Sequence, residues 1–150
     1  DDVLYLHKNP GRNGPEMRSR VGHRMPLART GIGKALLLDD SQEEWQRLYQ
    51  ASLPVGGKNL HWPQHPEQSW EQFEQRMREY VAGGYAFDLE DNEPSIRCVA
   101  APVRDASRRI VAGISIASTV PYMPLEKMAE LIPLIKQVAA RLSAELGAKA

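Results

Sequence analysis

The spacing of hydrophobic residues along this chain of 150 residues predicts both strands and helices. Apolar and polar residues alternate, with many β-branched side chains, at residues 3–7 and at about 85–89, 96–103 and 110–118, which is typical of strands. The connection "KNPGRNGP" is rich in turn residues. We therefore expect residues 16–21 to return as the second strand of a hairpin, and the chain after them to be irregular.

Helical spacing recurs in four segments, most of which begin with a recognisable cap. The first segment is residues 31–38, which follow the cap Thr30, and the second contains Trp45, Leu48 and Tyr49 after the capping pair Ser41/Glu44. The third contains Trp70, Phe73 and Met77 after the capping pair Ser69/Gln72. The fourth is residues 125–146. Gly83 is the expected end of the third helix, and Pro133 is expected to kink the last helix or break its first turn. Residues 53–66 are expected to form a loop. The sequence therefore predicts an α+β fold with a mostly antiparallel β-sheet flanked by helices.

The composition fits one domain and limits the classes of function. With 42% hydrophobic residues, the chain is able to bury a core as a single compact domain. Its 19 basic residues are balanced by 19 acidic ones, whereas a domain that holds DNA by itself carries a basic excess. No apolar run is long enough to span a membrane, and a single cysteine excludes an internal disulfide. We therefore expect a cytoplasmic protein.

Alternation along two strands separates small side chains from bulky ones. In "SIRCVAAPV", the side chains on one face are those of Ile96, Cys98, Ala100 and Pro102. In "IVAGISIAS", the bulky face consists of Ile110, Ala112, Ile114 and Ile116, and the small face consists of Gly113, Ser115 and Ala117. We expect the bulky face to pack against helices and the small face to leave room for another molecule.

The acidic segment between two strands places a carboxylate opposite the single cysteine. If the hairpin is symmetric about Glu93, Asp88 stands opposite Cys98, with their Cβ atoms about 5 Å apart on one face. Both side chains then look into a common cavity, flanked by Ala86 and Ala100. The other interpretation is an acidic turn on the surface beside a buried structural cysteine, since free cysteines are commonly small core residues. The spacing leaves both interpretations open.

Reactive and metal sites are weaker alternatives. A nucleophilic cysteine needs a neighbouring cation, and a carboxylate such as Asp88 disfavours its thiolate. The calcium-loop pattern that begins at Asp88 fails because its sixth residue is Glu93 rather than glycine. Prolines exclude the helix that would bring His61 and His65 together at a zinc ion. We therefore expect no catalytic residues, no metal and no other cofactor.

The glycines before the short predicted helix indicate a simpler kind of site. "ARTGIGKALLL" lacks the first glycine and the final hydroxyl residue of a phosphate-binding loop. Amides at the start of a helix are unpaired, so those around Gly31 and Ile32 suit a carboxylate or another small anion. The alternative is an ordinary capped helix start. Lys34 is expected to be a solvated charge on this helix.

Two segments together resemble a known family. "RVGHRMPLARTGIGKALLL" (residues 20–38) and "GYAFDLEDNEPSIRCVAAPVRD" (residues 84–105) are similar to the effector-binding C-terminal domain of the IclR family of bacterial transcriptional regulators. The second segment follows the family signature from Gly84 through Asp88 to Cys98. "IVAGISIAS" and the "LGAKA" ending also fit, so the resemblance covers nearly the whole chain.

The resemblance implies that residues 1–150 form a single GAF-like domain that senses a ligand. A strand starts almost at the first residue, so we expect the chain to be part of a longer protein whose winged helix-turn-helix domain precedes it. Matching the motif implies effector-binding residues at Gly31, Ile32, Asp88, Ile96, Cys98 and Ser115. The chain departs from the family pattern at Ala28, Asp91, Arg104 and Ala117. We expect Asp91 and Arg104 to be turn and surface changes, and the two alanines to alter the wall of the site.

The resemblance also implies partners. "RVGHRMPL" is most similar to members that control sugar-acid catabolism, so we expect the effector to be a sugar acid or another small carboxylic acid. We expect a dimer or tetramer with Trp45, Trp62 and Trp70 at its interface, contact with DNA only through the preceding domain, no contact with a membrane, and no enzyme activity. The alternatives are a GAF-like signalling module that binds a nucleotide or cofactor, and a small cysteine-dependent enzyme.

Overall fold

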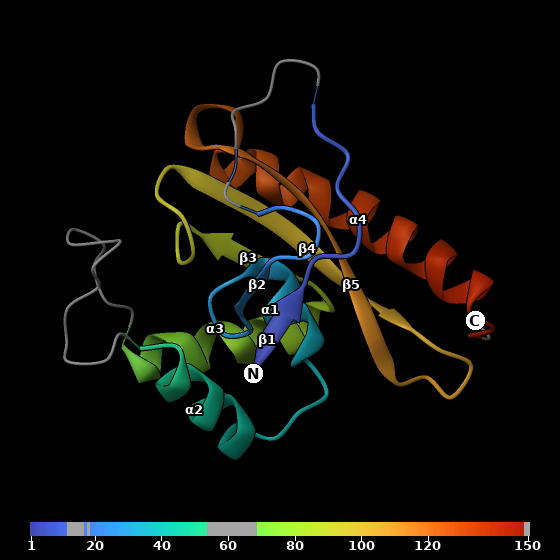
Figure 1. Ribbon diagram of the computed structural model, residues 1–150, viewed down its shortest axis with the longest axis horizontal. Coiled ribbons are helices and arrows are strands. Elements are labelled where there is room, and N and C mark those ends of the chain that lie inside the picture. The colour runs from blue at the N-terminus through green and yellow to red at the C-terminus, as the bar shows by residue number, and fades with distance from the viewer. Residues whose placement is uncertain (12–16, 18, 54–68, 149–150) are drawn as a thin grey trace.

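The computed structural model describes residues 1–11, 17, 19–53 and 69–148, which form two small sheets and four α-helices (Figure 1). In chain order the elements are β1 (Asp2–Leu4), β2 (Arg24–Pro26), α1 (Gly31–Leu36), α2 (Gln42–Ala51), α3 (Trp70–Gly83), β3 (Ala86–Leu89), β4 (Ile96–Arg104), β5 (Ile110–Thr119), the 3-10 helix η2 (Val120–Tyr122) and α4 (Leu125–Glu145). The predicted α+β organisation with antiparallel strands is confirmed. Most of the predicted loop, with His61, Trp62 and His65, lies outside the described residues.

The larger sheet has the strand order β3-β4-β5, and both of its strand pairs are antiparallel. In the β3–β4 hairpin, Asp88 is paired with Cys98 and Ala86 with Ala100, which confirms the register expected from symmetry about Glu93. In the described part of the chain β5 pairs with β4 alone, so the other edge of β5 belongs to no ladder.

Helices pack on both faces of this sheet, as Figure 1 shows. On one face, side chains of β4 pack against α4 in a cluster that contains Val99, Ala101, Val103, Met128, Ile135 and Ala139. On the other face, a second cluster joins the sheet to α1, α2 and α3 and contains Ala86, Ala100, Ala35, Leu48, Phe73, Met77 and Tyr80. The fully buried sheet residues of the second cluster are alanines, which allows α1 to approach the strands closely.

The N-terminal hairpin closes later along the chain than the sequence predicts. β1 pairs with β2, with Val3 opposite Met25. The expected return strand at 16–21 lies partly outside the described residues, and its described residues are not in a strand. Before β2 the chain makes a tight turn at Gly22, whose φ of +84° favours glycine and whose amide donates to the carbonyl of Tyr5 at 2.8 Å.

A β-bulge changes the face on which Ile110 lies. Val103 pairs with Ala112, but Arg104 pairs with Ile110, so β5 contains one extra residue at this point. Ile110 therefore packs against the cluster formed with α1, α2 and α3, whereas Ile114 packs against the α4 cluster. The expectation that both isoleucines share one face was wrong, because strict alternation does not hold across a bulge.

The helix caps largely agree with the sequence. The Ser69/Gln72 capping box has both of its hydrogen bonds. Ser41 accepts from the Glu44 amide, but the Glu44 carboxylate pairs with an arginine instead of completing a second box. α3 ends at Gly83, as expected, and its C-cap is Gly84, whose φ is +68°. The first turn of α4 is intact, and the helix continues through Pro133.

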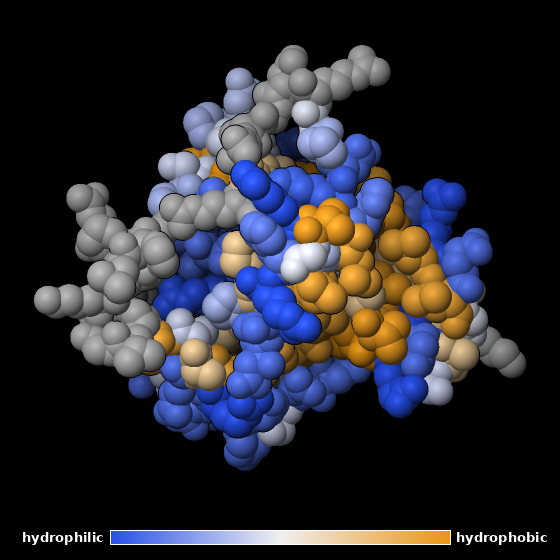
Figure 2. Space-filling model, viewed as in Figure 1, coloured by the Kyte–Doolittle hydropathy of each residue, from blue (hydrophilic) through white to orange (hydrophobic). Residues whose placement is uncertain are grey.

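One face of the domain carries an apolar region on its surface. Figure 2 shows apolar side chains gathered to the right of centre, over β5 and the neighbouring part of α4. These two elements carry the exposed residues Val111, Leu134 and Leu142. Within the described residues, none of the helices has the length and apolar character needed to cross a membrane.

Candidate functional site

The start of α1 lies directly against the cysteine on β4. A Cβ atom added at Gly31 would stand 2.4 Å from the sulfur of Cys98 and 3.5 Å from the Cβ of Ala100, so a side chain does not fit here. The backbone nitrogen of Asp88 lies 3.4 Å from the same position. The two sequence segments that were singled out separately therefore meet at this contact.

This contact predicts the effect of a single added methyl group. We expect Gly31→Ala to lower the free energy of unfolding by about 1–3 kcal/mol, the usual cost of overpacking a core. The gain in helix propensity is at most about 1 kcal/mol and is therefore outweighed. Urea denaturation measures the change. In a Cys98→Ala background the sulfur is gone, and Gly31→Ala should then cost much less; an equal cost in both backgrounds would contradict the steric explanation.

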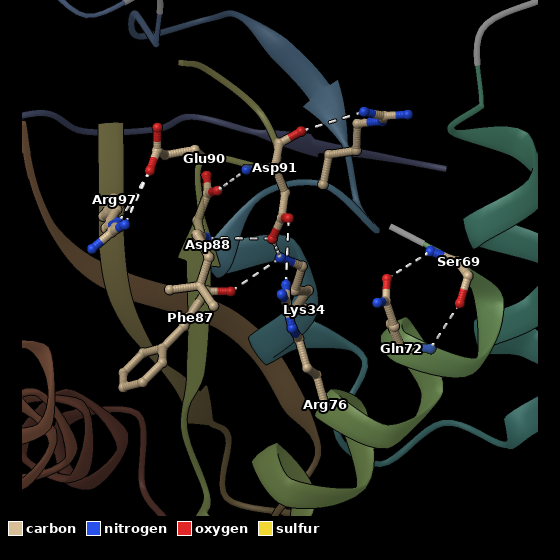
Figure 3. Close-up of polar contacts among 11 residues, drawn as sticks. Lys34, Ser69, Gln72, Arg76, Phe87, Asp88, Glu90, Asp91 and Arg97 are labelled. Carbon is tan, nitrogen blue, oxygen red and sulfur yellow. Dashed lines mark hydrogen bonds and ion pairs between the residues drawn. The ribbon is translucent and has the colours of Figure 1, made fainter. Parts of the chain in front are cut away.

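Asp88 is buried and held by the turn that follows it. Its side chain is 5% exposed, and its Oδ1 accepts from the Asp91 amide at 2.8 Å (Figure 3). Burial raises the pKa of the Asp88 carboxyl to about 7, while the ammonium of Lys34 acts in the opposite direction. The Asp91 amide uses one of about four acceptor positions of the carboxylate, so it retains capacity for further donors.

Lys34 is buried inside the domain, and the expectation of a solvated charge was wrong. Only 1% of this residue is exposed. Its Nζ donates to the carbonyl of Phe87 at 3.0 Å and forms an ion pair with Oδ2 of Asp91 (Figure 3). Burial alone would lower the pKa of Lys34, but the carboxylates of Asp91 and Asp88 raise it above its ordinary value. The lysine is therefore charged in the folded domain.

Asp91 is the centre of this network rather than a change on the surface. It is 8% exposed, and its other oxygen, Oδ1, lies 3.5 Å from Nη1 of Arg76 on α3 (Figure 3). Burial opposes ionisation, but Lys34 and Arg76 lower the pKa of Asp91 below its ordinary value. The acidic segment is thus buried at Asp88 and Asp91, which excludes the interpretation of a turn lying wholly on the surface. Arg104, by contrast, pairs with Asp39 near the surface, as expected.

Cys98 has the properties of a structural thiol. Burial, reinforced by the nearby Asp88, raises the pKa of the Cys98 thiol to about 12, so the sulfur is protonated at neutral pH. A thiol without thiolate character is a poor nucleophile, which argues against the cysteine-dependent enzyme. No group of three or more His, Cys, Asp or Glu side chains able to hold a metal ion occurs in residues 1–11, 17, 19–53 and 69–148.

The remaining predicted site residues lie on the same side of the sheet as α1. Ile32 lies over Gly113. A Cβ atom added to Gly113 would stand 3.0 Å from Cγ2 of Ile32. Ser115 is half-buried and pairs with Ala100, and Ile96 is buried at the start of β4.

Tyr5 is a residue of this site that the sequence interpretation missed. Its hydroxyl lies near the side chain of Thr30, the N-cap of α1. Burial, together with the nearby Cys98 and Asp88, raises the pKa of Tyr5. Alternation along the first strand places Tyr5 on the same inward side as the buried Val3, and this signal could have identified it.

Two of the three tryptophans expected at an interface, Trp45 and Trp70, pack inside the domain. Trp45 is 7% exposed and its indole donates to the carbonyl of Leu37 at 2.7 Å. Trp70 is half-buried against the rings of Tyr49 and Phe73. Trp62 lies outside the described residues. These aromatic residues stabilise the domain internally and give no support to an interface.

Comparison with protein families identifies what this arrangement is similar to. The family model for the bacterial transcriptional regulator IclR C-terminal domain matches residues 1–144. The HTH-type transcriptional regulator KdgR of Escherichia coli K12 is 29% identical over 147 residues, which are 98% of this chain and 54% of that protein. The HTH-type transcriptional repressor AllR of Salmonella typhimurium LT2 is 28% identical over 161 residues, covering 99% of this chain and 53% of that protein. The chain spans about half the length of the curated relatives that it matches.

Solved structures show the same fold. The Agobacterium tumefaciens repressor BlcR superposes with a TM-score of 0.81 at 28% identity, over 99% of this chain and 57% of that chain. The C-terminal domain of E. coli KdgR superposes with a TM-score of 0.72 at 26% identity, over 98% of this chain and 82% of that chain.

Proposed function

This chain belongs to the IclR family of bacterial transcriptional regulators as a C-terminal effector-binding domain, and from this premise we propose that it senses a small hydroxylated carboxylic acid. Its GAF-like fold, expected from the resemblance, is confirmed. The relatives that it matches are transcriptional regulators, not enzymes.

The buried carboxylate of Asp88 is the observation that carries this proposal. It faces the start of α1 beside a neutral thiol and has acceptor capacity left for hydroxyl groups of an effector. The pKa of about 7 leaves about half of the Asp88 carboxyl groups ionised at neutral pH, and hydrogen bonds to the ionised form are about twice as strong as neutral ones. The carboxylate of the effector would be repelled by Asp88, so we place it at the Ile32 amide on the far side of Gly31. Cys98, Ile96 and Ser115 then form the neutral wall of the site.

The response that we propose is a shift between two arrangements of a longer protein. The effector binds one arrangement more tightly and thereby changes the spacing of DNA-binding domains that precede this one. Contact with DNA belongs to those domains, since the present chain has no net charge.

We also propose a dimer or tetramer in the cytoplasm. The apolar surface over β5 and α4 supports self-association. The buried Trp45 and the half-buried Trp70, which were expected at the interface, give no such support.

A screen of small carboxylic acids by thermal unfolding tests the proposal, because a ligand of the folded state raises its stability. We expect polyhydroxy acids such as D-gluconate to raise the unfolding temperature more than acids without hydroxyls. Asp88→Ala should weaken the binding of the best acid by about 1.5–3 kcal/mol, measured by calorimetry. Cys98→Ser should have a smaller effect, since no reaction of the sulfur is required.

Asp105 supplies the matched control for that variant. Its carboxylate also accepts from backbone amides of a tight turn, those of Ser107 and Arg109, but at the β4–β5 connection. Asp105→Ala should leave the affinity unchanged. Equal affinities for the wild type and the Asp88→Ala variant would remove Asp88 from the site.

A further inference from the structure

The segment that carries Asp88 is held at both of its ends by one side chain. Lys34 donates to the carbonyl of Phe87, immediately before Asp88, and forms an ion pair with Asp91, three residues after it (Figure 3). Asp91 Oδ2 also lies 3.4 Å from the amide of Leu89, from which it accepts a hydrogen bond. The chain from Phe87 to Asp91 is therefore bent around the lysine ammonium.

The ion pair also fixes the group that orients the Asp88 carboxylate. The Asp91 amide donates to Asp88 Oδ1 at 2.8 Å, so the position of the Asp91 backbone determines where that oxygen lies. The Asp91 side chain is anchored from α1 by Lys34 and from α3 by Arg76. Its backbone carbonyl is anchored by Arg29, at 3.4 Å. Two helices and the segment before α1 thus meet at the turn that presents Asp88.

The ammonium reaches this position because of where Lys34 lies on α1. Lys34 follows Gly31 by one helical turn, so both residues project from the same side of α1 towards the sheet. Gly31 lets the helix approach Cys98 closely. The lysine then extends to the turn at the end of β3. Displacement of α1 by a bound molecule would therefore be felt at the ion pair.

We propose that Lys34 and Asp91 are the positioning pair of the effector site, which hold the Asp88 carboxylate in the orientation that accepts the hydroxyls of the effector. This inference rests on the proposed function, and it concerns residues that do not themselves touch the effector. A pair that served stability alone would be replaceable by apolar residues of similar volume. A positioning pair would not be replaceable in this way, because the orientation of the Asp88 carboxylate would be lost with it.

The double variant Lys34→Met/Asp91→Leu separates these two roles. It removes both charges together, so the domain should fold with a stability near that of the wild type. Without the ion pair, we expect the protection of the residue-91 amide against hydrogen exchange to fall by about tenfold or more, because its side chain no longer anchors the turn. We expect affinity for D-gluconate, measured by calorimetry, to fall by about tenfold as well.

Two further variants complete the experiment. Asp91→Glu keeps the carboxylate within reach of Lys34 and should retain both the amide protection and the affinity. Lys136→Met removes an exposed lysine that likewise donates to a backbone carbonyl, that of Gly83, and should change neither.

Amide protection and affinity that stay at wild-type values in a folded double variant would overturn the proposal. The exchange measurement needs no ligand, so it remains decisive if D-gluconate does not bind to the wild type. In that case lost protection in the double variant supports the positioning role, and the absence of binding counts against the proposed effector class alone.

Discussion

Replacement of Lys34 by Met should lower the free energy of unfolding of this domain by about 3–5 kcal/mol, the usual cost of breaking a buried ion pair by removing one partner. The variant leaves the Asp91 carboxylate buried, with Arg76 at 3.5 Å as its remaining charged partner. It also removes the donor to the carbonyl of Phe87. Urea denaturation followed by circular dichroism at neutral pH gives the difference directly.

Lys136→Met is the matched control for this measurement. That lysine lies on the surface, so its loss should change the unfolding free energy by no more than about 0.5 kcal/mol. If Lys34→Met also changed stability by less than 1 kcal/mol, as a rough limit set by exposed ion pairs, the buried pair would contribute no more than a surface pair. Restored stability in the double variant with Asp91→Leu would locate the cost in the unpaired carboxylate.

Asp88 should make the stability of the domain fall as pH rises from about 4 to 7. Its pKa is about 7 in the folded domain and is raised from an ordinary value of 3.8. A group with a raised pKa in the folded state stabilises fully below the ordinary pKa, and this contribution is lost as pH rises through the folded value. At about 1.4 kcal/mol for each pKa unit, the loss amounts to roughly 2–4 kcal/mol.

The Asp88→Asn variant isolates this contribution from those of the other carboxylates. The amide side chain keeps an oxygen that accepts from the Asp91 amide, but it does not titrate. The unfolding free energy of the variant should therefore increase relative to the wild type as pH rises from 4 to 8, as measured by urea denaturation at each pH. A difference between the two proteins that stays constant over this range would show that Asp88 has an ordinary pKa.

The part of the site that depends on local pattern was predictable from the sequence. Alternation in "SIRCVAAPV" and the length of the acidic segment were sufficient for the pairing of Asp88 with Cys98. The start of α1 at Gly31, with Thr30 as its cap, was also correct. These features are fixed by neighbours within about ten residues, which a sequence displays directly.

The features that were missed depend on contacts between distant segments. Lys34 has the sequence environment of an ordinary helix lysine, and its partner Asp91 is 57 residues away. Trp45 was misjudged because the carbonyl that accepts from its indole belongs to a turn outside its own helix. Ile110 changes face because of a bulge, for which alternation has no signal. Tertiary packing determines which charges are buried and where a strand bulges, so the spacing of apolar residues along the sequence predicts neither.

Among the residues that the structure describes, no strand pairs with the outer edge of β5, and this has a consequence for the behaviour of the chain in solution. Natural sheets protect such edges from aggregation with charged or proline gatekeepers. The ten residues of β5 include neither a charge nor a proline, and the surface around them is apolar. Strands of other copies are the available partners in a solution of this chain, so edge-to-edge association should increase with protein concentration. Ligand screens and unfolding measurements on this chain should therefore be carried out at one dilute concentration, below the onset of light scattering.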